Sequence, residues 1–479
     1  MPRPPSRGTL DELKAAVGGG SWFDSQEDLA PYVVDFRRLY RGSTPLVLLP
    51  RDVHQVSAIL RICDRDEVAV VPYGGNTSYC GAATPDESGS QIVLSMRRLN
   101  RVRQVDAGNY SMIIEAGCTL AEAQAAARTV DRLFPLSLGS EGTAQIGGNL
   151  STNAGGTAVL RYGMMRDLVL GLEVVLADGR VMSGLKSLRK DNTGYDVKSL
   201  FIGAEGTLGV ITAASLKLFP QPADTATALV GLDSPRHALD MLTRLRTAAG
   251  DQVTTFELMP RLAVELTVKH ISGVANPLAQ GTAWYLLIEL TSPRARRDSA
   301  QQDMVTLLTD ELQEAAAAGT IQDALIATSI AQSQAMWKLR ESVPEGQRHH
   351  GPSLKHDVSV PVSSIPQLIE EGSALVHRLA PEGEVVGYGH LGDGNLHFNV
   401  SQRPGADTAA FLQRGEQLER AIFDLVDSLG GSISAEHGIG RSKTAEFAHR
   451  ADPVELAVMR DLKRALDPKG ILNPGKVLS

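Results

Sequence analysis

Three glycine-rich loops in the first half of the chain constrain its fold more than any other feature. They are PYGGNTSYCG at Pro72–Gly81, LGSEGTAQIGGNLSTNAGG at Leu138–Gly156 and GAEGTLGVIT at Gly203–Thr212. Residues of these types let backbone N–H groups approach an anion closely, and their side chains add hydroxyl and amide donors. Long loops in compact domains are more often functional than idle. The three loops therefore predict a large phosphate-bearing cofactor, whose diphosphate the first two could wrap together.

The same loops argue against the two commonest nucleotide-binding folds. Neither the strand–GxGxxG–helix pattern nor the GxxxxGK[ST] pattern occurs in the right setting. We therefore do not expect a Rossmann fold or a P-loop.

Composition narrows the classes of function. The chain has 479 residues, of which 43% are apolar, and this suffices for a buried core and for two to four domains. The net charge of −8 and the lack of a basic block argue against nucleic acid or a membrane surface as partner. No apolar run reaches 18 residues, so we expect no membrane span.

The cysteines and the N-terminal residues indicate a reducing compartment. Cys63, Cys80 and Cys118 form neither a disulfide framework nor metal-ligand spacing, and we expect small buried hydrophobes. The first 20 residues carry Asp11 and Glu12 and no continuous apolar stretch, which is unlike a secretory or transit peptide. We therefore expect a cytoplasmic location.

Hydrophobic periodicity predicts an α+β fold in which the secondary structure changes in character near residue 220. Before residue 220, short strands alternate with helices, and one of these helices begins with a capping-box pattern. After it, longer strands and amphipathic helices predict an antiparallel sheet covered by helices, and LFPQPADTAT at 218–227 reads as a linker. The strands expected are Leu46–Leu49, Val68–Val71, Ile92–Ser95, Met112–Glu115, Val169–Ala177, Arg180–Ser183, Thr254–Met259, Trp284–Leu290, Ile321–Ala327, Lys355–Val362 and Glu384–Val400 with a turn inside it. The helices expected are Val53–Asp64, Thr119–Val130, Pro235–Ala249, Arg297–Ala318, Ile330–Arg340 and Ala409–Leu429.

The stretch GYGHLGDGNLHFNV at Gly387–Val400 places two histidines around that turn. Gly392–Asn395 is a hairpin signal, and strand alternation puts His397 and Asn399 on one face. His390, at the end of the first strand, can then lie near His397. Two imidazoles that face one point suit a metal site or a pair of catalytic groups.

A third ligand is available in SAEHGIGRSK at Ser434–Lys443. Glu436 would join the two histidines in a two-His-one-carboxylate set. Zinc accepts this set and keeps a position open for substrate, and manganese, cobalt and iron also tolerate it. The sequence therefore predicts a divalent-metal site, with zinc favoured.

The loop sequences, taken together, resemble a known class of flavoproteins. PYGGNTS, SLGSEGTAQIGGNLSTNAGG and LRKDNTGYDVKSLFIGAEGTLGVIT, within roughly residues 40–220, are similar to the FAD-binding domain of the vanillyl-alcohol-oxidase type. The resemblance implies a non-Rossmann FAD domain of two α/β subdomains. It implies non-covalent FAD, because residues 72–81 contain no histidine of the kind to which some members attach it. The positions it assigns to FAD are Pro72, Gly74, Gly75, Asn76, Thr77, Ser78, Gly139, Ser140, Gly142, Thr143, Gly147, Gly148, Asn149, Thr152, Asn153, Gly206, Gly209, Val210, Ile211 and Asn473.

The C-terminal half narrows the resemblance. GHLGDGNLHFNV, AEHGIGRSK and DPKGILNPGKV resemble the FAD-linked D-2-hydroxyacid dehydrogenases, which include the D-lactate, glycolate and D-2-hydroxyglutarate enzymes. The resemblance implies metal ligands at His390, His397 and Glu436, a catalytic base at His437, substrate-carboxylate cations at Arg340 and Lys355, and a substrate-contacting amide at Asn399. It divides the chain into an FAD domain at 1–220, a substrate domain with the metal site at 221–450, and a segment at 451–479 that returns to the FAD domain.

The expected reaction is oxidation of a D-2-hydroxy acid to the 2-oxo acid. A metal would orient the substrate and acidify its hydroxyl, His437 would take the proton, and a hydride would pass to flavin. D-2-hydroxyglutarate is favoured, because LRKDNTGYD and the histidine turn look closest to that branch. D-lactate or glycolate is the alternative, because Pro344 stands where D-2-hydroxyglutarate enzymes can carry a hydroxyl residue. An alternative of another class is a non-redox transferase like alkyl-glycerone-phosphate synthase.

The remaining partners are less defined by the sequence. The resemblance implies a homodimer, because members of the family commonly form one. An electron acceptor is required, but no sequence feature identifies it.

Overall fold

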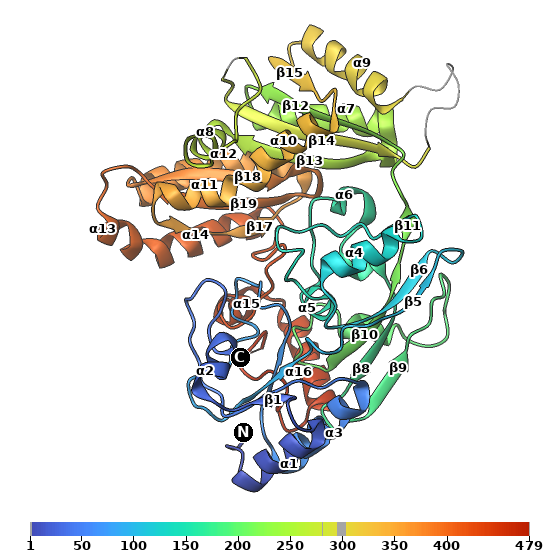
Figure 1. Cartoon of the computed structure of the whole chain (residues 1–479). Coiled ribbons are helices and arrows are strands. Elements are labelled where there is room, and N and C mark those ends of the chain that lie inside the picture. The colour runs from blue at the N-terminus through green and yellow to red at the C-terminus, as the bar shows by residue number, and fades with distance from the viewer. Residues whose placement is uncertain (1, 280, 295–302, 479) are drawn as a thin grey trace. The chain divides into compact units, whose positions relative to one another are not determined.

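The computed structural model describes residues 2–279, 281–294 and 303–478. The chain divides into two compact units (Figure 1). Residues 1–156, 163–221 and 436–479 form the first, and residues 157–162 and 222–435 form the second. The segment 436–450, which the sequence analysis placed in the substrate domain, groups with the first unit. Among the described residues, no helix has the length and apolar character needed to cross a membrane.

The first unit is built on two main sheets. One has the order β1 (Trp22–Phe23), β2 (Val47–Leu48), β4 (Ile92–Ser95), β3 (Val70–Tyr73), in which β2, β4 and β3 are parallel. The other is antiparallel, in the order β5 (Val102–Asp106), β6 (Ser111–Glu115), β10 (Val210–Lys217), β8 (Val169–Val175), β9 (Val181–Gly184). A short pair joins β7 (Arg132–Leu133) to β11 (Phe219–Pro220).

Helices cover these sheets. They are α1 (Arg7–Val17), α2 (Gln26–Leu29), α3 (Val53–Asp66), α4 (Leu120–Arg128), α5 (Ile146–Ser151), α15 (Thr444–Arg450) and α16 (Pro453–Leu466). All of those named here except α5 and α15 start at a side-chain cap. The predicted capping box is confirmed, since Thr119 accepts from the Glu122 backbone and the Glu122 side chain accepts from the Thr119 N–H. Apolar residues of α1 and α3 pack on the parallel strands, whose fully buried side chains form one core.

The second unit is one eight-stranded antiparallel sheet between helices (Figure 1). Its order is β15 (Asp323–Ile326), β12 (Asp224–Leu232), β14 (Trp284–Ser292), β13 (Val253–Pro260), β18 (Gly383–His390), β19 (Asn395–Gln402), β16 (Ser353–Leu354), and β17 (Asp357–Ser359) also pairs with β19. Its helices are α6 (Val159–Tyr162), α7 (Pro235–Ala249), α8 (Arg261–His270), α9 (Met304–Ala317), α10 (Ile330–Glu341), α11 (Val343–His350), α12 (Ile365–Leu379), α13 (Thr408–Gln413) and α14 (Gly415–Ser428).

Each face of this sheet has its own apolar core. One core joins the sheet to α7, α9, α12 and α14. The other joins it to α8, α10 and the start of α11. The predicted α+β class, with an antiparallel sheet covered by helices, is therefore confirmed.

Some element predictions were wrong in detail, and one lies partly outside the described part of the chain. The helix expected over Ala409–Leu429 is two helices that break at Arg414, where Gly415 packs on Leu354 and lowers the local helix propensity. The linker expected at 218–227 holds β11 and the start of β12. The helix expected over Arg297–Ala318 is described from Met304, and its first residues lie outside the described part of the chain.

Candidate flavin and substrate sites

The first two glycine-rich loops lie against each other in the first unit. A Cβ added at Gly75 would stand 2.1 Å from the carbonyl oxygen of Thr143, so only glycine fits there. A Cβ at Gly74 would stand 3.6 Å from the Cα of Gly148. The two loops, which are distant in the sequence, therefore form one continuous backbone surface.

That surface carries the features expected of a cofactor cradle. A Cβ at Gly139, Gly142 or Gly148 would meet no protein atom within 4 Å, so the backbone there is open to close approach by a ligand. At the N-cap of the adjoining helix α5 and within that helix, Gln145 Oε1 and Asn149 Nδ2 are buried without a hydrogen-bond partner. Buried polar atoms are nearly always satisfied, so these two indicate a polar ligand. Both observations fit FAD.

The third loop and the C-terminal segment adjoin the first loop. Gly206 has φ +74° and lies against the ring of Pro72, with its Cβ position 3.0 Å from Pro72 Cγ. The backbone N–H of Asn473 donates to Val70 O at 2.8 Å, and Asn473 Nδ2 donates to Ala82 O and Glu205 O at 3.1 and 2.7 Å. The side-chain Oδ1 of Asn473 is buried and has no protein partner. It is therefore a third unsatisfied polar atom at these loops.

Several residues assigned to FAD hold the loops in shape. Asn76 has φ +52°, and its Nδ2 donates to Val34 O at 2.9 Å. Asn153 Oδ1 accepts from the Arg166 N–H at 2.8 Å. Gly209 packs against Val174, with its Cβ position 2.6 Å from Val174 Cγ1. The remaining assigned positions line the same loops or, for Val210 and Ile211, begin strand β10.

Two glycine substitutions separate packing of the loops from binding of the cofactor. We expect Gly148→Ala to leave the stability of the FAD-free protein unchanged, because its Cβ meets no protein atom. Its FAD affinity should fall roughly 10- to 100-fold, the cost of a methyl group in a filled site. Gly75→Ala should lower both the stability of the FAD-free protein and its FAD affinity, because its Cβ collides with Thr143. Fluorescence titration with FAD measures the affinity, and thermal unfolding of the FAD-free variants measures the stability. Normal FAD affinity in Gly148→Ala would contradict the assignment of this loop to FAD.

In the second unit, the predicted histidines share one face of the sheet. Tyr388 pairs with His397 in the β18–β19 register. The ring centroids of His390 and His397 lie 5.6 Å apart, and those of Tyr388 and His397 lie 5.2 Å apart. His397 Nδ1 lies 3.5 Å from a carboxylate oxygen of Asp357 on β17. The hairpin therefore brings the two imidazoles together as the alternation of the strands predicted.

A buried glutamate that the sequence analysis missed joins this face to Arg340. Glu257 on β13 is 0% exposed and lies opposite His390 in the strand register. Its carboxylate contacts His390 Nδ1 at 2.5 Å and Arg340 Nε at 2.7 Å. Burial would raise the pKa of Glu257, but the charge of the Arg340 guanidinium and the hydrogen bonds from His390 and Arg340 outweigh it and lower that pKa to about 2. The only signal in the sequence is a carboxylate next to apolar residues inside a buried strand.

Arg340 and Asn399 are held by neighbours on the same face. The Arg340 guanidinium lies over the ring of Tyr388, 5.0 Å from its centroid. Asn399 Nδ2 donates to Gln347 Oε1 at 2.9 Å, and Gln347 Nε2 donates to Ser401 Oγ at 2.9 Å. Side chains of β13, β18, β19, α10 and α11 thus meet on one face of the sheet. Lys355 lies between β16 and β17 and is partly buried.

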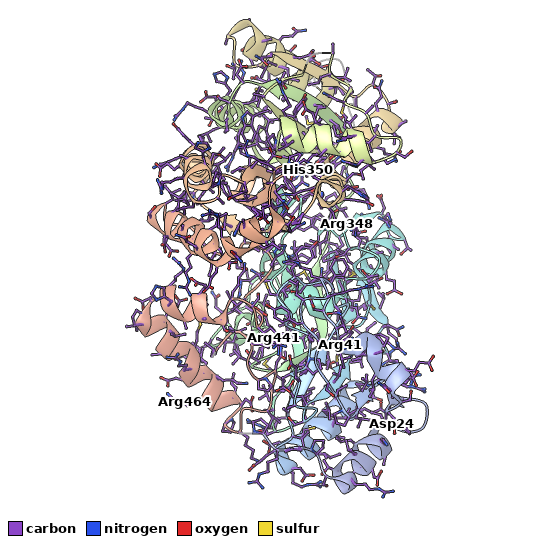
Figure 2. All side chains as sticks on the ribbon, turned by 90° about the vertical axis from the view of Figure 1, so that its left-hand side faces the viewer. Asp24, Arg41, Arg348, His350, Arg441 and Arg464 are labelled. Atoms are coloured by element: carbon purple, nitrogen blue, oxygen red, sulfur yellow. The ribbon has the colours of Figure 1, made fainter. Side chains whose placement is uncertain are left out.

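Helix α11 ends with His349 and His350. His350, labelled in Figure 2, lies 2.8 Å from Glu384 Oε1. Pro344 stands in the first turn of α11, the position of a helix where proline is tolerated best.

Glu436 and His437 follow directly on the last residue of the second unit. The Ala435 N–H donates to Asp357 O at 3.3 Å. In the first unit, the His437 ring lies edge-on to the Tyr79 ring at 4.6 Å, and Ser78 Oγ donates to His437 O at 3.4 Å. Burial raises the pKa of the Tyr79 hydroxyl, against the effect of Arg37. The predicted base thus packs on the first glycine-rich loop.

Glu205 fixes the backbone that follows His437. It is buried, and its two oxygens accept the N–H groups of Ile439 and Gly440 at 2.7 and 2.8 Å. Burial raises the pKa of this carboxyl to about 7, although those two bonds oppose the rise. The sequence analysis placed Glu205 in the third loop but assigned it no role.

The Glu205 pKa predicts a pH dependence of stability. The unfolded carboxyl titrates near 4.5, so between about pH 4.5 and 7 the folded protein keeps a proton that the unfolded chain has lost. Stability should therefore fall as pH rises through this window, by up to ~3 kcal/mol. Glu205→Gln removes the titration, so its melting temperature should decline less than that of the wild type between pH 5 and 7.5. The exposed Glu87→Gln is the control, and parallel pH profiles for wild type and Glu205→Gln would refute the prediction.

The fold and the loops define a flavoprotein whose FAD domain is not of the Rossmann type. A family model described as FAD binding domain matches residues 44–184, and one described as FAD linked oxidases, C-terminal domain, matches residues 221–477. The chain belongs to the family of FAD-linked oxidases. It is an FAD-dependent oxidoreductase.

Curated relatives match nearly the whole chain. A protein of Arabidopsis thaliana named mitochondrial D-2-hydroxyglutarate dehydrogenase is 36% identical over 97% of this chain and 80% of its own length. A protein of Bos taurus with the same name is 39% identical over 98% of this chain and 83% of its own length. The D-2-hydroxyglutarate dehydrogenase of Stutzerimonas stutzeri is 32% identical over 98% of each chain.

Solved structures confirm the fold. An alkyldihydroxyacetonephosphate synthase matches with a TM-score of 0.75 at 19% identity, over 99% of this chain and 86% of its own. A p-cresol methylhydroxylase matches with a TM-score of 0.75 at 16% identity, over 100% and 99%. At these identities the likeness shows the fold alone, which is the vanillyl-alcohol-oxidase type expected from the sequence.

Proposed function

We propose that the protein oxidises D-2-hydroxyglutarate to 2-oxoglutarate, with FAD as the hydride acceptor and a divalent metal, zinc first, as a second cofactor. The substrate is supported by the names of relatives that are 32–39% identical over almost the entire chain. The single observation that carries the chemistry is the cluster of two imidazoles and a guanidinium on one face of the second unit.

The proposed metal ligands are His390, His397 and Glu436. They offer two imidazole nitrogens and a carboxylate oxygen, a set that suits zinc, manganese, cobalt or iron. A bound metal would supply Lewis-acid activation of the substrate hydroxyl. The 5.6 Å between the rings of the two histidines supports this assignment.

The chain's own residues would complete the reaction. Arg340 and Lys355 bind the substrate carboxylate, and a guanidinium can do so through two parallel hydrogen bonds. Asn399, already oriented by Gln347, contacts the substrate through its amide. His437 takes the hydroxyl proton while the α-hydrogen leaves with its electron pair to the flavin, and the product is the 2-oxo acid.

A single experiment tests both the reaction and its substrate. Stopped-flow absorbance follows flavin bleaching in oxidised protein mixed with D-2-hydroxyglutarate, D-malate, D-lactate or glycolate. We expect D-2-hydroxyglutarate to reduce the flavin fastest, without any other electron donor. Bleaching by none of the four would reject the dehydrogenase, and fastest bleaching by D-lactate or glycolate would reassign the substrate.

One observation favours that second substrate class. Pro344, in the first turn of α11, offers no hydroxyl to a distal carboxylate. D-lactate and glycolate have no distal carboxylate, so their oxidation would not need one. The structural likeness to alkyldihydroxyacetonephosphate synthase is a likeness of fold and favours no alkyl transfer.

The cytoplasmic location and the homodimer are proposals that rest on the sequence, whereas no sequence feature identifies the electron acceptor. Fractionation of cells, light scattering and reoxidation of the reduced flavin by candidate acceptors would measure them.

A further inference from the structure

We propose that Glu257 is a positioning residue that couples the metal site to the site for the substrate carboxylate. The inference rests on the proposed function, and it concerns a residue to which that function gives no role. The Glu257 carboxylate contacts both His390 and Arg340.

The position of Glu257 follows from the strand register. Its partner on β18 is His390, and the next residue, Leu258, pairs with Gly389 and faces the opposite core. Glu257 therefore points to the face that carries Tyr388 and the two histidines. No part of its side chain is exposed, so the carboxylate interacts with protein groups alone.

The contact with His390 selects the atom that can bind a metal. Glu257 Oε1 lies 2.5 Å from His390 Nδ1. An ionised carboxylate only accepts hydrogen bonds, so it keeps the imidazole proton on Nδ1 and the lone pair on Nε2. Carboxylates in this position orient metal-binding histidines and increase their basicity.

The contact with Arg340 fixes the guanidinium. Glu257 Oε2 accepts from Nε at 2.7 Å, and the guanidinium plane is supported by the Tyr388 ring. The Arg340 guanidinium is thus held in place through its Nε. The Tyr388 ring also packs on His397, so the five side chains form a closed ring of contacts.

The metal site and the substrate-carboxylate site are coupled because the Glu257 carboxylate contacts a residue of each. If it moves or loses its charge, His390 loses its orienting acceptor and Arg340 loses its buried counter-charge at the same time. Metal affinity and carboxylate affinity should therefore change together in a Glu257 variant.

The test compares Glu257→Gln with Glu289→Gln in FAD-loaded protein. Glu289 is a glutamate of the adjacent strand β14 whose carboxylate accepts from Trp337 Nε1. Zinc affinity is measured by competition with a chromogenic chelator, without substrate or turnover. Affinity for 2-oxoglutarate is measured at saturating zinc from the change in flavin absorbance.

In Glu257→Gln we expect zinc affinity to fall roughly 10- to 100-fold. We expect 2-oxoglutarate affinity to fall about tenfold. Glu289→Gln should change neither by more than about twofold. If Glu257→Gln does not fold, Glu257→Asp replaces it, because its carboxylate keeps its charge but is one methylene too short to reach both partners.

The outcomes separate this inference from the proposed function. Wild-type protein that binds no zinc would reject the metal site itself. Wild-type protein that binds zinc, with equal affinity in Glu257→Gln, would reject the role of Glu257. Loss of zinc affinity with unchanged 2-oxoglutarate affinity would reject the coupling.

Discussion

Removal of the proposed divalent metal is expected to slow flavin reduction by D-2-hydroxyglutarate roughly 10³-fold, which corresponds to ~4 kcal/mol of Lewis-acid stabilisation. The physical reason is that the substrate hydroxyl is a weak acid until its oxygen is coordinated. Stopped-flow reduction after treatment with a chelator, and again after addition of zinc, manganese or cobalt, measures the effect. The FAD absorbance before mixing reports whether the chelator has left the flavin in place.

His390→Ala and His397→Ala should reproduce the effect of the chelator, and added metal should not rescue them. His377→Ala, on the exposed side of α12, is the matched control and should behave as wild type. If flavin reduction proceeds at the same rate in the presence of chelator, the two histidines do not bind a metal. They then handle protons or support the structure.

Replacement of His437 should lower the rate of flavin reduction about 10²- to 10⁴-fold, the usual worth of a general base. His437→Asn keeps a polar side chain of similar reach but cannot accept the hydroxyl proton near neutral pH. FAD content and the affinity for 2-oxoglutarate should stay close to wild type, so the loss would appear in the chemical step. The measurement is the limiting reduction rate as a function of pH.

Tyr79→Phe is the control for that variant. It keeps the ring that packs edge-on against His437 and removes only the hydroxyl, so its reduction rate should change by no more than a few-fold. Reduction in His437→Asn within tenfold of wild type would show that the base is another group.

The sequence predicted the fold where its signals were local. Glycine loops after buried strands, the capping box at Thr119 and the turn at Gly392–Asn395 each depend on residues close together in the chain, and each appears in the structure. The strand β12 was missed because its start, after two prolines, is polar. The break at Arg414 was missed because it depends on the packing of Gly415 against Leu354.

In the candidate site, too, the sequence predicted only contacts between residues that are close together in the chain. His390 and His397 could be paired from the sequence because one hairpin joins them. Glu257 could not, because it is 133 residues away from His390 and meets it only through the register of β13 with β18. Gln347 and Glu205 were missed for the same reason, since each acts on a segment that is distant in the sequence.

The parallel bridge between Val70 and Leu472 has a consequence for synthesis on the ribosome. Residues 222–435, nearly all of the second unit, leave the ribosome as one continuous stretch and have their partners available. The first glycine-rich loop emerges much earlier but must wait about 400 residues for Asn473, which at ~5–20 residues per second is a delay of roughly 20–80 s. The N-terminal unit is thus the last to be completed, although its first strands are synthesised before the second unit.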